Sequence, residues 1–296
     1  MVEGLILTSV VLAPALVYTT VGGYLHQRAG VVNIALEGLI VMGGLTGMLA
    51  ADGLDSALGG IGVAVGAGAL VGWAFTLVVS RLKGNEIIVG LGFNILMLGL
   101  AGLVLVQSFG TRASYRPEGY QRLPGFGLPF LEEVPFLGSL LARQDLVVWG
   151  MIPAVIAAVW VLSRTSWGLR LRAVGADATS SEHLGLSVYG IREQVGAVAG
   201  ALSALAGAHL SIAVVGLFSA GMSAGRGYIA LAAVYFAPRR LWLAVLAAFI
   251  FVVVDALQIR FQLRLPWLPV QLVQILPYLA VILALTFSKL TRKEPR

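Results

Sequence analysis

Side chains that could perform catalysis are few and scattered in this sequence. It has no cysteine, and its three histidines, His26, His183 and His209, are too far apart in the sequence to indicate a metal site. No HExxH or Walker A lysine motif occurs, so a zinc site and a phosphate-binding loop are not indicated. We therefore expect no catalytic residue, no metal and no cofactor bound directly by this chain.

Polar side chains inside otherwise apolar stretches are the candidates for contacting a solute. These are Asn33, Glu37, Asn94 and His209. A charge at the centre of a membrane helix costs about 2.5–3.5 kcal/mol, so Glu37 is expected to have a partner or a wet cavity. A second acid, Asp255, is expected to pair with Arg226 or Arg260. Hydrogen bonding between helices is the alternative role for each of the four candidates.

The overall composition places these side chains in a membrane. Hydrophobic residues make up 58% of the 296 residues and charged residues only 11%, whereas soluble domains are about 25% charged. Too little charge is available to cover a soluble surface. A soluble enzyme and a nucleic-acid-binding domain are thereby excluded, although the net charge is +6.

Nine membrane segments account for the apolar stretches, and a count of 8 to 10 segments fits the sequence. A helix needs about 20 residues to cross the hydrocarbon core, and eight stretches approach or exceed that length: 4–25, 29–51, 56–80, 87–111, 146–163, 194–225, 241–257 and 265–288. One further stretch, 227–238, is the seventh in chain order; it is short and either extends back toward Met222 or is re-entrant. Glu37 would lie about two turns into the second segment. The predicted fold class is an all-α polytopic membrane protein, with residues 1–296 forming one transmembrane domain.

The distribution of Lys and Arg predicts the orientation. One set of alternate loops carries thirteen of these residues and the other set seven, and cytoplasmic loops are the more basic ones. The C-terminus is therefore expected in the cytoplasm and the N-terminus outside. The loop 164–193 would be cytoplasmic and the long loop 111–145 would be outside. An even number of segments would invert the N-terminal half of this assignment.

The predicted cytoplasmic loop contains a short helix. Thr179-x-x-Glu182 matches the capping-box pattern, and Gly185 follows as a helix stop. The basic residues Arg170 and Arg172 would hold this helix against membrane lipid. Such a helix is a natural contact for a partner protein, and an inert amphipathic loop is the alternative.

Two patterns of small residues indicate how helices pack or break. Gly196, Gly200, Ala204 and Ala208 recur every four residues, as do the pairs Gly43/Gly47 and Gly62/Gly66, which predicts close helix packing. Residues 29–36 and 224–231 share five of eight positions. These two copies lie five segments apart, so they would run in opposite directions, as in an inverted repeat with broken helices near the membrane midplane.

The stretch from Gly23 to Gly38, GYLHQRAGVVNIALEG, resembles the signature of permease subunits of bacterial ABC importers for nucleosides and simple sugars. These are relatives of the ribose and branched-chain amino acid permeases. The resemblance continues through 85–98, 168–191, 224–236 and 255–258, in the expected order and over most of the chain. The stretches 23–38 and 224–236 are the most specific.

The resemblance implies a division of labour among several subunits. Two permease chains, identical or paralogous, would form the pathway, and an extracytoplasmic binding protein would deliver the substrate. Cytoplasmic ATPase subunits would hold ATP and Mg²⁺ and engage a coupling helix in the loop 164–193. The coupling residues would be Arg170, Arg172, Gly175, Thr179, Glu182 and Gly185. The chain would be a multi-pass protein of the bacterial cell membrane.

Three other functions are alternatives to this one. A permease for branched-chain amino acids or another small solute would share the same architecture. An ion-coupled secondary transporter would need acids or histidines deep in several segments, and only Glu37 is clearly deep. A membrane-embedded enzyme would need clustered nucleophiles or metal ligands, which the sequence does not show.

Overall fold

The computed structural model describes residues 2–110, 114–117, 123–126, 144–237, 240–264, 275, 279 and 286. Helices dominate these residues. The long helices are α1 (Val2–Arg28), α2 (Leu36–Gly53), α3 (Ala57–Ser80), α4 (Glu86–Phe109), α7 (Leu146–Arg164), α10 (Val188–Ala208) and α12 (Leu241–Arg264). The shorter ones are α8 (Ser166–Ala176), α9 (Ala178–His183), the π-helix η1 (His209–Val215) and α11 (Arg226–Phe236). Two-residue strands, β1 (Gly125–Phe126) and β2 (Gln144–Asp145), pair antiparallel.

Seven of the described helices are long and apolar enough to cross a membrane, and α11 is a shorter apolar helix. They correspond to the first eight predicted segments in order, so the all-α polytopic fold is confirmed. The ninth predicted segment, 265–288, falls almost wholly outside the described residues. Most of the predicted outer loop, 111–145, also falls outside them.

Two predicted segments have different boundaries in the structure. The second was expected to start at Ala29, but the chain turns at Gly30, runs non-helically through residues 31–33, and enters α2 only at Leu36. Glu37 is therefore the second residue of its helix, and the prediction that it lies two turns inside was wrong. The sixth segment was expected to reach Gly225. It ends at Gly216, because η1 closes there in a left-handed conformation with φ 73°.

Helix α10 forms the centre of the bundle and packs against α1, α2 and α3. Its predicted stripe of small residues makes these contacts: a Cβ on Gly196 or Gly200 would overlap the backbone of α3. In membranes, such close approach substitutes for hydrophobic association. On α3, however, the contacts come from Gly68 and Gly72, whereas Gly62 and the equally predicted Gly66 face open space. The prediction of close packing was therefore correct for α10 and wrong for Gly62 and Gly66 of α3.

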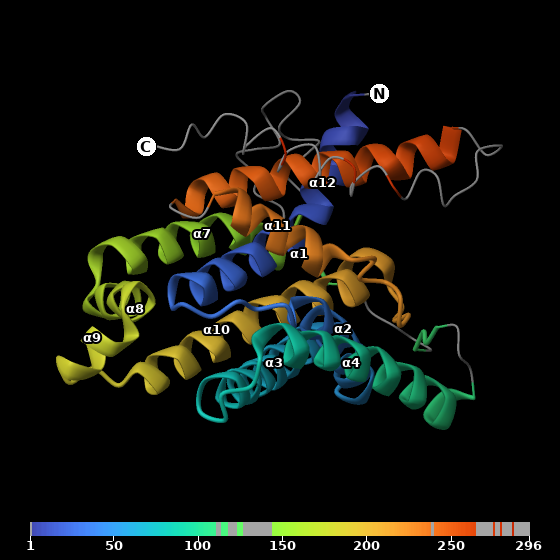
Figure 1. Cartoon of the computed structure of the whole chain (residues 1–296). Coiled ribbons are helices and arrows are strands. Elements are labelled where there is room, and N and C mark those ends of the chain that lie inside the picture. Colours follow the sequence, from blue (N-terminus) through green and yellow to red (C-terminus); the bar gives the residue numbers. More distant parts are fainter. Residues whose placement is uncertain are drawn as a thin grey trace.

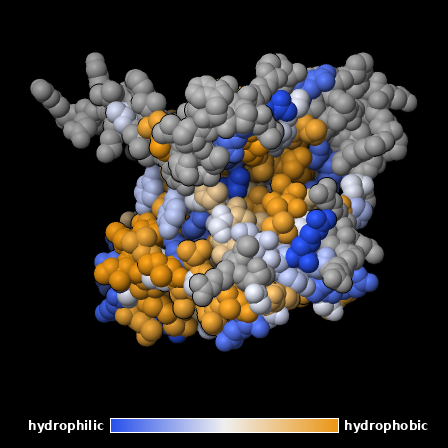
Figure 2. Space-filling view, turned by 90° about the vertical axis from the view of Figure 1, so that its right-hand side faces the viewer, coloured by the Kyte–Doolittle hydropathy of each residue, from blue (hydrophilic) through white to orange (hydrophobic). Residues whose placement is uncertain are grey.

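The helices lie in layers, with α3 and α4 on one side, α7 and α12 on the other, and α1, α2 and α10 between them (Figure 1). Helices α8 and α9 project together at one end of the bundle. Figure 2 looks onto the opposite end. Pale and blue polar residues cross its middle, and apolar residues gather at its lower left, at the height of α3 and α4 in Figure 1. The exposed apolar side chains of α4, such as Ile88 and Ile95, are what a lipid- or partner-facing helix presents.

Candidate functional site

The start of α2 and the start of α11 meet at Glu37. Its Oε1 accepts hydrogen bonds from the Ser223 hydroxyl over 2.6 Å and from the Gly225 N–H over 2.9 Å, and its Oε2 accepts one from the Gly227 N–H over 2.7 Å. The first N–H groups of a helix have no partner within the helix and carry partial positive charge, so a carboxylate is favourable there. The charge of Glu37 is thus neutralised by the first turn of α11.

A glycine at position 227 is needed for this junction. A Cβ on Gly227 would overlap the backbone N and Cα of Glu37. The turn before α11 is also specialised, because Ala224 and Gly225 both have positive φ, 48° and 78°. The two segments that share the internal sequence similarity, 29–36 and 224–231, therefore border one contact. That they form an inverted repeat stays a prediction.

Asn94 joins the same junction from α4. Its Oδ1 accepts a hydrogen bond from the Gly38 N–H over 2.8 Å, while its Nδ2 lies 2.8 Å from the Ile34 carbonyl oxygen and 3.0 Å from the Tyr228 hydroxyl. One buried amide thereby links α2, α4 and α11. Asn94 is suited to this role because an amide both donates and accepts.

A cavity of about 320 Å³ opens beside these groups. It is lined from α2, α4, the turn before α11 and α11 itself by Glu37, Val41, Asn94, Ile95, Leu98, Ala220, Gly221, Ser223, Ala224, Gly225 and Tyr228. This volume lies at the lower end of the range for small-molecule sites, which are mainly apolar with a few polar groups. The cavity can bind a small, mostly uncharged solute through hydrogen bonds.

The other two candidates are placed elsewhere. Asn33 is buried and bonds to His26 Nδ1 over 2.8 Å and to the Ala35 N–H over 3.0 Å, which stabilises the turn between α1 and α2. His209 is fully buried at the start of η1 and contacts Asp145, the residue that caps α7, over 3.0 Å. Neither lines the cavity that Glu37 and Asn94 share.

A buried ion pair secures α11 from its other side. Arg226 binds Asp255 of α12 through Nε over 3.1 Å and Nη2 over 2.7 Å. The predicted pairing of Asp255 with Arg226 is thus confirmed. The pairing fixes the first residue of α11 to α12 while Glu37 fixes its N–H groups to α2.

The α8–α9 loop contains a helix where it was predicted, but with a different cap. The side chain of Asp177, not Thr179, accepts the N-terminal hydrogen bond, from the Ser180 N–H over 3.1 Å. The capping-box prediction for Thr179 and Glu182 was therefore wrong, because α9 starts two residues earlier than that motif requires. Hydrogen bonds from Ser180 hold the pKa of the Asp177 carboxyl below its usual value. The predicted stop at Gly185 is present, with φ 80°.

The remaining residues of this loop point in different directions. Gly175 packs so closely on the Arg28 carbonyl that a Cβ would overlap it, which ties α8 to the end of α1. Arg170 is exposed, whereas Arg172 is half-buried and lines a separate pocket. Leu184, just after α9, has 81% of its surface exposed.

Sequence reasoning missed Tyr228 and Ser223 as members of the site. The glycines around them did mark a break in the helix, and Tyr228 occupies the position that matches Asn33 in the internal similarity. That alignment was the available signal, but the apolar neighbours of Tyr228 gave no indication of which way its hydroxyl points.

Comparisons with known proteins agree with this architecture. Residues 5–285 match the family described as branched-chain amino acid transport system / permease component. A protein of Haloferax volcanii provisionally designated a glucose ABC transporter permease is 31% identical over 263 residues, covering 88% of this chain and 78% of the relative. No solved structure gives a significant match.

Two further relatives are named as permeases of nucleoside transporters. The nucleoside ABC transporter permease of Lactococcus lactis subsp. cremoris is 30% identical over 229 residues, covering 75% of this chain and 71% of the relative. The guanosine ABC transporter permease of Bacillus subtilis is 28% identical over 291 residues, covering 94% and 89%. With its crossing helices and its match along nearly the whole chain, this multi-pass membrane protein belongs to the family of permease components of ABC transport systems.

Proposed function

We propose that this permease carries a nucleoside or a simple sugar, delivered by an extracytoplasmic binding protein, through a pathway that includes the Glu37–Asn94–Tyr228 cavity. The observation that carries the proposal is the chemistry of that cavity. The Asn94 amide and the Tyr228 hydroxyl donate and accept without charge. Hydroxyl-rich or heterocyclic solutes need such partners. The names of the three relatives support the same substrate classes.

An amino-acid substrate fits this cavity less well. A zwitterion needs opposite charges from the protein, and Glu37 is the one charged residue among the described lining residues. Its two oxygens already accept three hydrogen bonds from residues 223–227. The described lining residues include no Lys or Arg that would pair with the carboxylate of an amino acid.

The pathway would continue along one face of α11. A second cavity, of about 470 Å³, is lined by Leu231 and Tyr235 of this helix and by Glu86 at the start of α4, among others. Tyr228, Leu231 and Tyr235 are spaced to lie on the same side of a helix. Beside them, α4 exposes Ile95, with 74% of its surface accessible. A second permease chain, identical or paralogous, would close this open side.

Energy would enter through the α8–α9 loop. In this proposal the loop faces the cytoplasm, cytoplasmic ATPase subunits contact α9 and Leu184, and ATP and Mg²⁺ stay on those subunits. Their closure would move α8 and, through the Gly175–Arg28 contact, the end of α1. The C-terminus would be cytoplasmic in a bacterial cell membrane. Alternating access of the paired permeases would then release the solute.

Transport by the reconstituted complex tests this function. Proteoliposomes would contain this chain with its ATPase subunits and binding protein, and uptake of labelled guanosine, glucose and leucine would be compared. We expect guanosine or glucose uptake that requires internal ATP and survives ionophores that collapse proton and sodium gradients. Uptake by this chain alone in ion-loaded vesicles would instead show a secondary transporter, and leucine uptake alone would refute the substrate class.

A further inference from the structure

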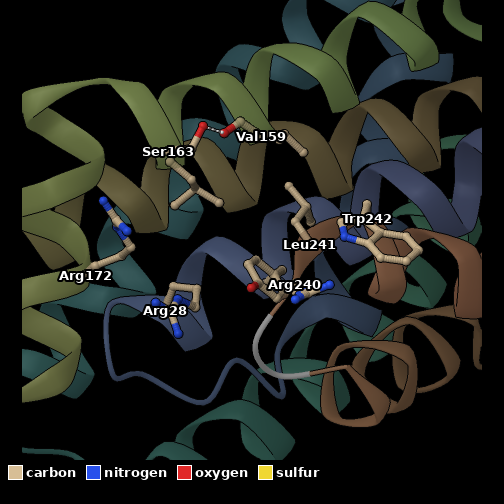
Figure 3. Close-up of a pocket in the computed structure, with 9 residues that line it drawn as sticks. Arg28, Val159, Ser163, Arg172, Arg240, Leu241 and Trp242 are labelled. Carbon is tan, nitrogen blue, oxygen red and sulfur yellow. Dashed lines mark hydrogen bonds between the residues drawn. The ribbon is translucent and has the colours of Figure 1, made fainter.

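Three arginines from separate parts of the chain converge on one pocket. Arg28 ends α1, Arg172 lies on α8, and Arg240 immediately precedes α12. The pocket has a volume of about 200 Å³ and also includes Tyr24, Val159, Leu162, Ser163, Leu241 and Trp242. Figure 3 shows Arg28, Arg172 and Arg240 around the pocket, with Val159 and Ser163 of α7 above and Trp242 beside Arg240. Among the residues that the structure describes, no acidic residue lines this pocket.

None of these three guanidinium groups bonds to a carboxylate among the described residues. Arg172 donates only to the Gly168 carbonyl within its own helix, over 3.3 Å. The contrast within this chain is clear, since Arg81 pairs with Glu193 and Arg226 with Asp255. Three converging positive charges repel one another, so an anion with several acceptor oxygens would stabilise the pocket.

Two stripes of exposed apolar side chains run away from this pocket. On α7, Ile152, Ile156 and Trp160 recur every four residues with 56%, 62% and 58% of their surfaces exposed. On α12, Trp242, Leu246 and Ile250 have the same spacing, with 51%, 50% and 54% of their surfaces exposed. Each stripe has a tryptophan at the end beside the arginines. Tryptophan is enriched at the level of lipid headgroups.

We propose that this pocket binds the phosphate headgroup of one anionic phospholipid, whose acyl chains lie along the stripes of α7 and α12. Basic pockets between membrane helices at a headgroup level are suited to anionic lipid. A free phosphate would satisfy the arginines but would leave the tryptophans and both apolar stripes without a role. The bound lipid joins the ends of α1 and α12 to α8 and so holds the base of the α8–α9 loop at the membrane surface.

Native mass spectrometry of the full-length chain in detergent tests the site. The delipidated protein would be titrated with phosphatidylglycerol and, separately, with phosphatidylcholine. We expect one phosphatidylglycerol to remain bound at concentrations where phosphatidylcholine does not. An arginine near anionic lipid contributes about fivefold in affinity, so Arg28→Gln/Arg172→Gln/Arg240→Gln should weaken binding by about 100-fold. Arg240→Gln alone changes one exposed residue and should weaken it by about fivefold.

The control removes the same charge from the same end of the molecule. Lys83→Gln/Arg164→Gln/Arg170→Gln replaces three exposed basic residues outside the pocket, and it should keep the bound lipid. Equal losses in the pocket and control variants, equal binding of the two lipids, or an unchanged affinity in the Arg240→Gln variant would overturn the proposal. Displacement of the lipid by millimolar inorganic phosphate would show a small-anion site instead.

Discussion

Oε2 of Glu37 accepts a hydrogen bond from the backbone N–H of Gly227 across 2.7 Å, although the two residues are 190 positions apart. The contact joins the first turns of α2 and α11, and the missing Cβ of Gly227 lets the two backbones touch. The most polar point of the candidate pathway is therefore also a structural joint. Substitutions there are expected to change stability as well as transport.

Glu37→Gln should destabilise the protein. The glutamine amide keeps one oxygen but turns an NH₂ group toward backbone N–H donors, so one of the charge-assisted hydrogen bonds is lost at a cost of about 1.5–3 kcal/mol. Thermal unfolding in detergent would show a lower midpoint than the wild type. Glu182→Gln, at an exposed position of α9, is the matched control and should unfold like the wild type. Unchanged stability of Glu37→Gln together with lost uptake would assign Glu37 to solute contact alone.

Two glycines of α3 should differ sharply in their tolerance of a methyl group. Gly72→Ala would overlap the Gly196 carbonyl of α10 and should cost about 1–3 kcal/mol, as overpacking does. Gly66→Ala meets no atom within 4 Å and should be neutral or slightly stabilising. Unfolding of the two variants in the same detergent measures the difference. Similar midpoints would mean that α3 and α10 do not pack this closely.

Asp177 rather than Thr179 should control the attachment of the ATPase. Asp177→Ala removes the side chain that accepts from Ser180 and should weaken α9, whereas Thr179→Ala should leave the helix unchanged. Capture of the ATPase subunit by each variant provides the measurement. Normal capture by Asp177→Ala, or a defect confined to Thr179→Ala, would contradict the assignment of the cap.

The cap of α9 should also respond to pH in one direction. Hydrogen bonds from Ser180 lower the pKa of Asp177 in the folded state below its unfolded value. Its stabilising effect is therefore complete above about pH 4, where the unfolded carboxyl is ionised, and is lost as pH falls through the folded-state pKa. Amide exchange of α9 should show no dependence on this group near neutral pH. An Asp177→Asn variant should lack the acid-dependent loss.

Tyr228→Phe should impair substrate affinity without uncoupling ATP hydrolysis. The change removes the hydroxyl that bonds to Asn94, and one such hydrogen bond is worth about 1 kcal/mol, or about fivefold in KM. Uptake kinetics in proteoliposomes would measure it. Tyr189→Phe changes a tyrosine at the start of α10, outside the cavity, and should leave KM unaltered. Equal effects of the two changes would remove Tyr228 from the pathway.

The coarse architecture could be predicted from local composition. Long apolar stretches gave the order of the crossing helices, and small residues every four positions marked α10 as a packed helix. The internal similarity also indicated helix breaks within residues 29–36 and 224–231, and Gly30 and Gly225 in these two stretches have positive φ in the structure. Each of these features depends on residues close together in the chain, where hydrophobicity and backbone preference act directly.

The partners of the polar side chains could not be predicted in this way. Nothing near Glu37 indicates that its acceptors face the start of α11, and residues 31–35 carry no proline to show that α2 begins late. The cap at Asp177 was missed because the start of α9 depends on where α8 ends. The arginine pocket unites residues 28, 172 and 240, so it exists only once α1, α8 and α12 have packed. Long-range contacts depend on how helices are arranged in space, and local sequence patterns do not encode that arrangement.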